Sequence, residues 1–420
     1  MEYDFRRMVD ELKLPESIME SFNAWNLDLL TTKLEQRNQE ALEVLEEGRC
    51  HALLADFPEA AGAADALAPL ISQMRSFEAL RNWLLVEVAL RVHELATPGA
   101  PKLPPGMLEP LLGKEGCALF YLLAALTTVP QWFATYRRMG IPESYARQTL
   151  GRLANEIAAF RQKNGYWGFR HDLHWYKHFI DGKLFSIGRF EYMVRETPPW
   201  IPAVFRNKRT GKLVLLARDG WLFTADGYRL ALDRTPAAAD FTASLVQNGT
   251  TIRGTKIDPR GFALLQNEVE LPASEYEAVM KPYELTAEIH IPGGGGMTME
   301  KVKASLLEAR EFFPKYLGWR VPFFWCVSWV FNPEIAQEMP DSNIARLQSR
   351  CYLAPRDSTA DAGLIFVFGK TDGNWAEYPG ETSLQRAFLR IIHRGSPLKY
   401  GVMVIDDAGI DAFCPGFYQQ

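Results

Sequence analysis

The feature that most constrains this chain is a change in hydrophobic period near Lys183. Before it, apolar residues recur every three to four positions, for example at Phe77, Leu80 and Leu84, which is the pattern of one helix face. After it, short stretches alternate polar and apolar residues, as strands do. The sequence therefore predicts an α+β protein, with an all-helical domain at residues 1–165 and a mixed α/β domain at residues 166–420.

The helical half contains several recognisable segments and no convincing strand. We expect helices at residues 3–12, 31–47, 69–95, 107–126 and 142–161, and a linker rich in Pro and Gly at 98–106. The longest apolar run, residues 117–134, is interrupted by Thr127, Thr128 and Pro130. Its uninterrupted part is too short to span a bilayer. We therefore expect a buried core helix and no membrane partner.

The net charge and the cysteine content argue against several classes of function. The 420 residues carry a net charge of −5 and no long Lys/Arg run, which argues against a nucleic-acid partner. The N-terminus is acidic and lacks the apolar stretch of a secretory signal. The five cysteines are odd in number and form no CxxC pair. They indicate reduced thiols in a cytoplasmic protein, with no disulfide framework and no metal site.

The second half begins with turn-rich, strand-like sequence and then changes character. Residues 183–270 predict an antiparallel meander, and 274–280 a short helix. Residues 284–291 alternate strictly, four glycines follow, and Thr298 can cap a helix that leads to the apolar run 323–331. Strand, helix and strand at this spacing predict a parallel crossover. The tail predicts strands at 346–353, 363–368 and 400–405 and a helix at 383–394.

The candidate catalytic residues are Glu288 and His290. They lie two apart in an expected strand, so both side chains point to the same face. A carboxylate beside an imidazole can work as a general base, because the acid holds the ring and raises its basicity. A solvated sheet face explains the same pattern, and both interpretations stay open.

The candidate cofactor-binding residues are Gly293, Gly294, Gly295 and Gly296, which lead from that strand into the helix. Glycines let backbone amides approach a ligand, and a helix N-terminus favours a phosphate. The run lacks the Lys-Ser or Lys-Thr ending of a P-loop, and Glu300 in the first helical turn would repel an anion. A flexible loop is the simpler alternative.

Other polar residues are weaker candidates. Cys326 and Ser328 share one face of an apolar strand and could line a substrate pocket, to which we add Asn343 from a turn-forming stretch. Ser328 lies outside any G-x-S-x-G elbow, so we favour packing or substrate contact over a nucleophilic role. The spacing of His171, His174 and His178 would suit a metal, but aromatic residues surround them and no Glu joins them.

Several segments together resemble a bacterial family in which a helical N-acyltransferase N-terminal domain precedes a GNAT-like C-terminal domain. The similar segments are residues 182–190, 288–292, 305–313, 327–329 with 332–333, and 342–344. GNAT proteins place an Arg/Gln-x-x-Gly-x-Gly/Ala loop after their fourth strand, where its amides bind the coenzyme A pyrophosphate. Residues 290–295 match its glycines, with His290 at the first position. No Tyr follows in residues 332–341, where many members keep the acid that protonates the leaving thiolate.

The resemblance implies one activity and leaves one alternative. It implies an N-acyltransferase that uses acyl-CoA or acetyl-CoA as cosubstrate and acylates a small-molecule amine. Glu288 or His290 would accept the amine proton, and the glycine loop would hold the pyrophosphate. The alternative is a protein of the same fold that binds a small molecule or a partner without catalysis.

Overall fold

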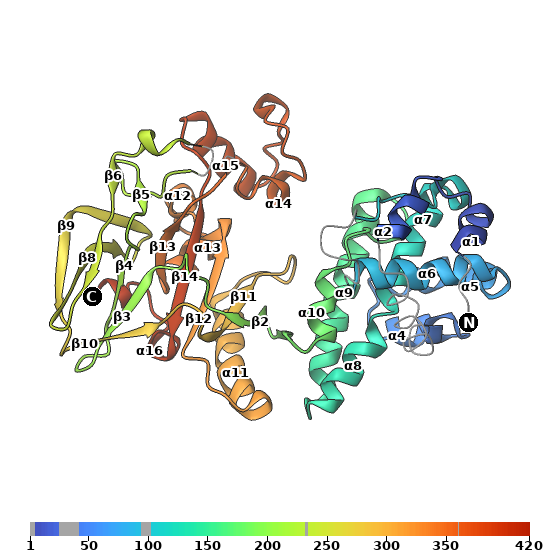
Figure 1. Ribbon diagram of the computed structural model, residues 1–420, viewed down its shortest axis with the longest axis horizontal. Coiled ribbons are helices and arrows are strands. Elements are labelled where there is room, and N and C mark those ends of the chain that lie inside the picture. Colours follow the sequence, from blue (N-terminus) through green and yellow to red (C-terminus); the bar gives the residue numbers. More distant parts are fainter. Residues whose placement is uncertain (1–4, 25–41, 94–101, 232–233, 360) are drawn as a thin grey trace. The chain divides into compact units, whose positions relative to one another are not determined.

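The chain divides into two compact units, Met1–Ser186 and Ile187–Gln420. The computed structural model describes residues 5–24, 42–93, 102–231, 234–359 and 361–420 (Figure 1). The expected helix at 31–47 and the linker at 98–106 lie partly outside the described residues.

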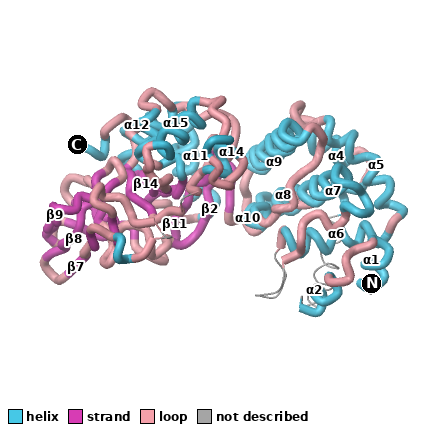
Figure 2. Tube along the Cα trace, turned by 90° about the horizontal axis from the view of Figure 1, so that it is seen from above, coloured by secondary structure: helices cyan, strands magenta, loops and turns pink. Residues whose placement is uncertain are grey.

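The regular structure of the first unit is helical among its described residues, up to the start of a strand at Leu184 (Figure 2). Its helices are α1 (Phe5–Leu12), α2 (Ile18–Ala24), α4 (Arg49–Leu54), α5 (Gly62–Ser76), α6 (Glu78–Arg91), α7 (Glu109–Leu126), α8 (Val129–Arg138), α9 (Glu143–Asn164) and α10 (Trp175–Ile180). The stretch Glu109–Arg138 is long and apolar enough to cross a membrane by composition, but 78% of its most apolar window is buried inside the protein. That burial is typical of a core helix, as the interrupted sequence predicts.

The first unit extends past the end of its last long helix. α9 ends where Gly165 adopts a left-handed conformation and donates its amide to the carbonyl of Arg161. Beyond it, Tyr176 stacks on Trp132 of α8 with ring centroids 5.9 Å apart, and the Thr135 hydroxyl donates to the carbonyl of Ile180. These contacts place residues 166–186 with the helical unit, although the sequence pattern assigns them to the second domain.

The second unit is built on two six-stranded sheets. Its strands, with β1 at the boundary, are β1 (Leu184–Ile187), β2 (Phe190–Glu196), β3 (Ala203–Asn207), β4 (Leu213–Leu216), β5 (Leu222–Phe223), β6 (Phe241–Thr242), β7 (Leu245–Gln247), β8 (Thr251–Asp258), β9 (Phe262–Pro272), β10 (Tyr276–Met280), β11 (Leu285–His290), β12 (Phe323–Ser328), β13 (Tyr352–Arg356) and β14 (Tyr400–Asp406). One sheet has the order β1-β2-β11-β12-β14-β13. The other has the order β10-β3-β4-β8-β7, and β9 pairs with β8. β5 and β6 pair in a small third sheet. The helices are α11 (Met299–Leu317), α12 (Pro333–Glu338), α13 (Asn343–Gln348), α14 (Leu364–Phe368), α15 (Ser383–His393) and α16 (Asp407–Ala412).

The predicted crossover is confirmed, and it organises the first sheet. β11 and β12 are parallel, with Glu288 opposite Trp325, and α11 connects them. The Thr298 side chain caps α11, as expected. Phe313 of α11 packs against Tyr192 and Phe324, with ring centroids 6.3 and 6.2 Å away, so α11 covers one face of the sheet.

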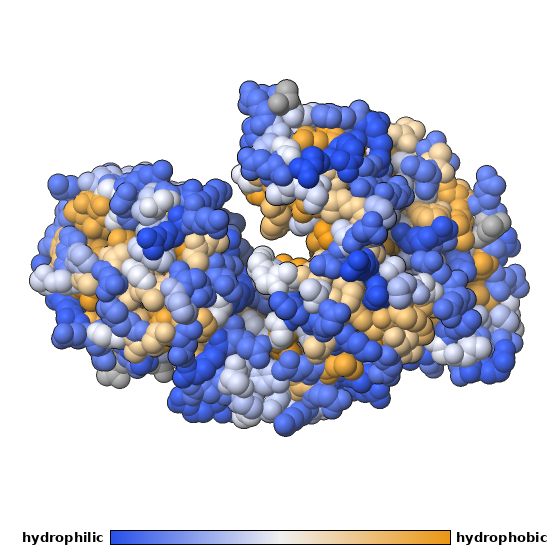
Figure 3. Space-filling model, turned by 180° about the vertical axis from the view of Figure 1, so that it is seen from behind, coloured by the Kyte–Doolittle hydropathy of each residue, from blue (hydrophilic) through white to orange (hydrophobic). Residues whose placement is uncertain are grey.

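The opposite face of the first sheet packs against the second sheet. Trp325 and Val404 from the first sheet share one buried apolar cluster with Val204 and Leu215 from the second. β3, β4, β8 and β9 pair antiparallel in succession, so part of the expected meander forms. Its first two strands, β1 and β2, belong instead to the first sheet, where β2 pairs with β11. Figure 3 shows that hydrophilic side chains cover much of the outer surface, with apolar groups in smaller areas.

Three expected elements are wrong, each for a local reason. The expected helix at 274–280 contains β10, because Tyr276 pairs with Asn207 of β3 and extends the sheet. The expected strand at 346–353 is replaced by α13 and the start of β13, because the Ser342 side chain caps a helix there. The expected strand at 363–368 is α14, because left-handed glycines bound it at Gly363 and Gly369.

Candidate functional site

Glu288 and His290 lie side by side at the end of β11. The Nε2 atom of His290 is 3.6 Å from Oε2 of Glu288, which confirms that the two side chains share a face. The Glu288 side chain is 8% exposed and the His290 side chain 28%. A reactant in solvent can therefore reach the imidazole more easily than the carboxylate.

Arg195 of β2 completes this group. Its Nη1 donates to Oε2 of Glu288 at 2.7 Å. Burial alone would raise the pKa of Glu288, but the hydrogen bonding and charge of His290, and then of Arg195, outweigh burial and lower this pKa. Glu288 is therefore an ionised, buried carboxylate at neutral pH.

An aromatic side chain of the neighbouring strand β12 packs against Arg195. Trp325 of β12 is fully buried, and the Arg195 guanidinium lies over its ring, 5.8 Å from the centroid. Our sequence interpretation missed both Arg195 and Trp325. Only the strand register, which aligns Glu288 with Met193 and Trp325, reveals them.

The glycine loop follows His290 directly. Gly294, Gly295 and Gly296 have φ values of +76°, +69° and +67°, which side chains with a Cβ rarely adopt. A Cβ at any of these positions would meet no atom within 4 Å. The four glycines are exposed. The loop is therefore open on the side where a Cβ would point, and another molecule could approach its backbone there.

Two cationic side chains hold the loop in place. Arg189 Nε donates to the carbonyl of Gly296 at 2.5 Å, and its Nη2 donates to that of Pro292 at 2.9 Å. Lys301 Nζ donates to the carbonyl of Gly295 at 2.7 Å. Arg189 and Lys301 therefore bring positive charge beside the loop and the helix N-terminus that adjoins it, where Glu300 of the first helical turn adds a negative charge. These residues fit a phosphate-bearing cosubstrate.

The three predicted pocket residues do not gather around His290. The alternation along β12 puts Cys326 on the face opposite Trp325, which is the face that α11 covers. Cys326 is 2% exposed, and burial raises the pKa of its thiol well above the usual value. The Ser328 hydroxyl accepts the amide of Val330, and Asn343 is an exposed residue at the start of α13. A role in substrate contact stays a prediction for these three residues.

The arrangement suits proton transfer better than metal chemistry. An accessible imidazole backed by a fixed carboxylate is a general base, and neighbouring amides can stabilise an oxyanion. Among the residues that the structure describes, no group of three His, Cys, Asp or Glu side chains is placed to hold a metal ion. The three histidines of the first unit have different neighbours. His171 lies near Tyr121, His174 pairs with Asp172, and His178 contacts Trp175.

Two family profiles match adjoining parts of the chain. The N-acyltransferase N-terminal domain matches residues 48–182, and the GNAT-like C-terminal domain matches residues 184–403. Among solved structures, an acyltransferase mutant in complex with octanoyl-CoA is 18% identical with a TM-score of 0.55. An acyltransferase in complex with decanoyl-CoA and teicoplanin is 18% identical with a TM-score of 0.54. Each likeness covers 96% of this chain and 99% of the other, and shows a shared fold. No curated protein matches.

Proposed function

The chain belongs to the family that joins an N-acyltransferase N-terminal domain to a GNAT-like C-terminal domain, and on this basis we propose that it transfers an acyl group from acyl-CoA to a small-molecule amine. One observation carries the proposal. The His290–Glu288–Arg195 group lies two residues before a glycine loop that Arg189 and Lys301 hold. A proton acceptor and a phosphate-binding loop thus adjoin on one strand end, as a reaction on a coenzyme A thioester requires.

His290 is the proposed general base. Coenzyme A would supply the acyl group as a thioester, and the acceptor nitrogen attacks its carbonyl carbon, so that a C–N bond replaces the C–S bond. His290 accepts the proton that the nitrogen loses, and the same proton then passes to the departing sulfur. This return makes a separate tyrosine acid unnecessary in residues 332–341.

Glu288 is the proposed positioning residue. Its carboxylate is buried, and its lowered pKa keeps it ionised when His290 gains a proton. Arg195 fixes the same carboxylate oxygen from β2. The pair therefore stabilises the imidazolium and orients the ring, while the more exposed His290 meets the reactants.

The glycine loop is the proposed site for the cosubstrate's pyrophosphate. Amides of Gly293, Gly294, Gly295 and Gly296 can point at phosphate oxygens, since none of them donates a hydrogen bond among the described residues. Arg189 and Lys301 add positive charge to both sides of the loop. This placement brings the reacting end of a bound thioester toward the end of β11.

A cytoplasmic location completes the proposal. All five cysteines are unpaired, and Cys50, Cys117, Cys326 and Cys351 are buried. Buried, reduced thiols suit a compartment that keeps cysteines reduced. An amine-bearing small molecule of that compartment is the proposed acceptor.

The test is thiol release from acyl-CoA. We expect the purified protein to release free coenzyme A from octanoyl- or acetyl-CoA only when an amine from a screened panel is present, and to give the matching amide by mass spectrometry. If an acyl-CoA binds but no amine in the panel is acylated, the non-catalytic alternative gains. Absence of acyl-CoA binding at millimolar concentration would overturn the proposal.

A further inference from the structure

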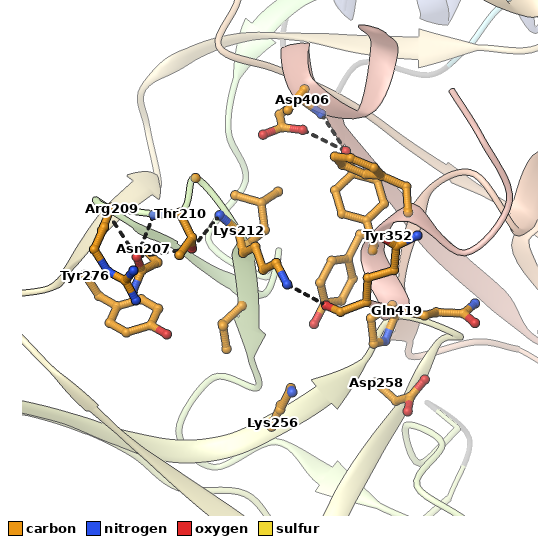
Figure 4. A pocket seen from close by; sticks show the side chains of 18 of the residues that line it. Asn207, Arg209, Thr210, Lys212, Lys256, Asp258, Tyr276, Tyr352, Asp406 and Gln419 are labelled. Carbon is orange, nitrogen blue, oxygen red and sulfur yellow. Dashed lines mark hydrogen bonds between the residues drawn. The ribbon is translucent and has the colours of Figure 1, made fainter. Parts of the chain in front are cut away.

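The second unit contains a cavity of about 840 Å³ apart from the glycine loop. Its walls come from the β3–β4 turn, the β8–β9 turn and the segment at residues 417–420 (Figure 4). It also reaches Asp406 at the end of β14, which pairs with Phe323 at the start of β12. Because β11 runs parallel to β12, the glycine loop lies at the other end of these strands. Six residues of strand separate the two sites by roughly 20 Å.

Buried contacts hold one wall of the cavity in place. The Tyr418 hydroxyl donates to Oδ1 of Asp406 at 2.8 Å and accepts the amide of Asp406 at 3.1 Å. Arg206 Nη2 lies 3.4 Å from Oδ2 of the same carboxylate, which is 3% exposed. Lys212 reaches across the cavity, where its Nζ donates to the carbonyl of Gln420 at 3.3 Å (Figure 4). The segment at 417–420 is thus held by the hydrogen bonds of Tyr418 and Gln420 and forms one wall of the cavity.

The cavity has more positive than negative charge. Two of its carboxylates have partners, since Arg260 binds Asp258 with two nitrogens and Arg206 binds Asp406. Three further cations line it: Arg209, Lys212 and Lys256. Within the described residues none of the three forms an ion pair with a side chain, and Lys212 is bonded to an oxygen of Gln420. Glu275 is the remaining lining side-chain carboxylate, so the side chains that line the cavity carry more positive than negative charge.

Aromatic rings line the same space. Tyr276 lies on the side of the β3–β4 turn, and Tyr352 and Phe417 lie on the other. Tyr352 is buried, and its hydroxyl donates to the carbonyl of Ile257 at 2.7 Å and accepts the amide of Leu215, so it belongs to the fixed floor of the cavity. Tyr276 and Phe417 are half-buried and can offer their rings to a ligand. Flat aromatic surfaces favour a planar ring in the ligand. The volume lies in the range of small-molecule sites, about 300–1,000 Å³.

We propose that this cavity binds a phosphate monoester of a planar ring compound, of which nucleoside monophosphates are the simplest. The negatively charged phosphate matches the excess of positive side chains and would lie between Lys212 and Lys256. The ring would pack against Tyr276 and Phe417. This site goes beyond the proposed acyl transfer, because it is a second ligand site at the opposite end of the sheet.

The experiment is calorimetric titration of the full chain with adenosine 5′-monophosphate, with adenosine as the uncharged probe. We expect the monophosphate to bind with an affinity that falls as salt rises, and adenosine to bind at least tenfold more weakly. Lys256→Gln should weaken monophosphate binding roughly tenfold, because a charge-assisted hydrogen bond is lost. Lys256 makes no side-chain hydrogen bond within the described residues, so the variant should melt at the temperature of the parent.

Two matched variants locate the binding. Lys315→Gln removes an exposed lysine of the same unit on α11, and Lys301→Gln removes a lysine of the glycine loop. Both should bind the monophosphate like the parent. Loss in Lys301→Gln with retention in Lys256→Gln would place the ligand at the loop and overturn the proposal. Equal binding of adenosine, equal affinity in Lys256→Gln and Lys315→Gln, or no binding at millimolar concentration would also overturn it.

Discussion

Two buried carboxylates lie on the same face of the first sheet of the second unit, on different strands. The Glu288 side chain is 8% exposed and the Asp406 side chain 3%, and each is paired with an arginine. They differ in their third partner. Glu288 faces the imidazole of His290, whereas Asp406 accepts from the Tyr418 hydroxyl, and burial raises the pKa of that phenol well above its usual value.

This difference in partners gives the two carboxylates different roles: Glu288 can assist a reaction, whereas Asp406 holds a segment of the fold in place. An imidazole exchanges protons near neutral pH, so a fixed carboxylate beside it can assist a reaction. A phenol of raised pKa stays protonated, so the same kind of carboxylate only fixes the segment that carries it. Asp406 also accepts the amide of Gly409 at the start of α16. Burial of an acid therefore says little about function until its partners are known.

The largest expected effect is on turnover when the imidazole is removed. His290→Ala should lower the rate of acyl transfer by roughly 10²–10⁴-fold, the usual contribution of a general base. The matched control is His393→Ala, which removes an exposed histidine in the last turn of α15. It should keep the parent rate. Equal rates in the two variants, measured as coenzyme A release, would exclude His290 as the base.

The next effect is on stability, at Asp406. Asp406→Asn should lower the free energy of unfolding by about 2–3 kcal/mol, because it leaves Arg206 without its charge partner and weakens the hydrogen bonding to Tyr418. Glu288→Gln should cost less, because its partner Arg195 is 45% exposed and stays better solvated than Arg206, which is 31% exposed. Urea unfolding of both variants checks this order. A larger loss in Glu288→Gln would make that residue the structural one.

A smaller, pH-dependent effect is expected at Arg195. Because the pKa of Glu288 is lowered in the folded protein, its charged contacts stabilise the fold fully above the unfolded value of about 4.3. That stabilisation is lost as the pH falls through the folded value. Arg195→Met should therefore cost about 1–2 kcal/mol at pH 7, a modest amount because the guanidinium is 45% exposed. The difference in melting temperature from the parent should shrink below pH 4. A constant difference would mean that the loss comes from packing on Trp325.

The sequence predicted those parts of the fold and site whose signals are local. Alternation over residues 284–291 placed Glu288 and His290 on one face, and the Thr298 cap placed the start of α11. It failed at residues 363–368, where an apolar run typical of a strand is a short helix bounded by left-handed glycines. A short, continuous apolar run shows neither the helical nor the strand period. Its secondary structure therefore depends on the residues that flank it.

Residues brought together from distant segments were beyond prediction. Arg195 reaches Glu288 across 93 positions of the chain, and Arg206 reaches Asp406 across 200. The cavity at Asp406 has walls from six separate segments, none with a motif. These groups form because the strands pair in a particular register. A short stretch of sequence does not contain that register, since it depends on two strands far apart in the chain.

The smallest expected effect tests the glycine loop itself. Gly295 has φ +69°, and a Cβ there would meet no atom within 4 Å, so Gly295→Ala introduces backbone strain without a clash. The matched control is Gly318→Ala at the other end of α11, with φ +76° and equally open surroundings. Each variant should lose about 1 kcal/mol of stability, the usual cost of alanine in this conformation. If the loop binds the cosubstrate, only Gly295→Ala should raise KM for acyl-CoA, by a few-fold, with kcat little changed, because the chemistry at His290 is untouched. Steady-state kinetics with varied octanoyl-CoA distinguish the outcomes. The same KM for octanoyl-CoA in both variants would show that the glycine loop does not bind the cosubstrate.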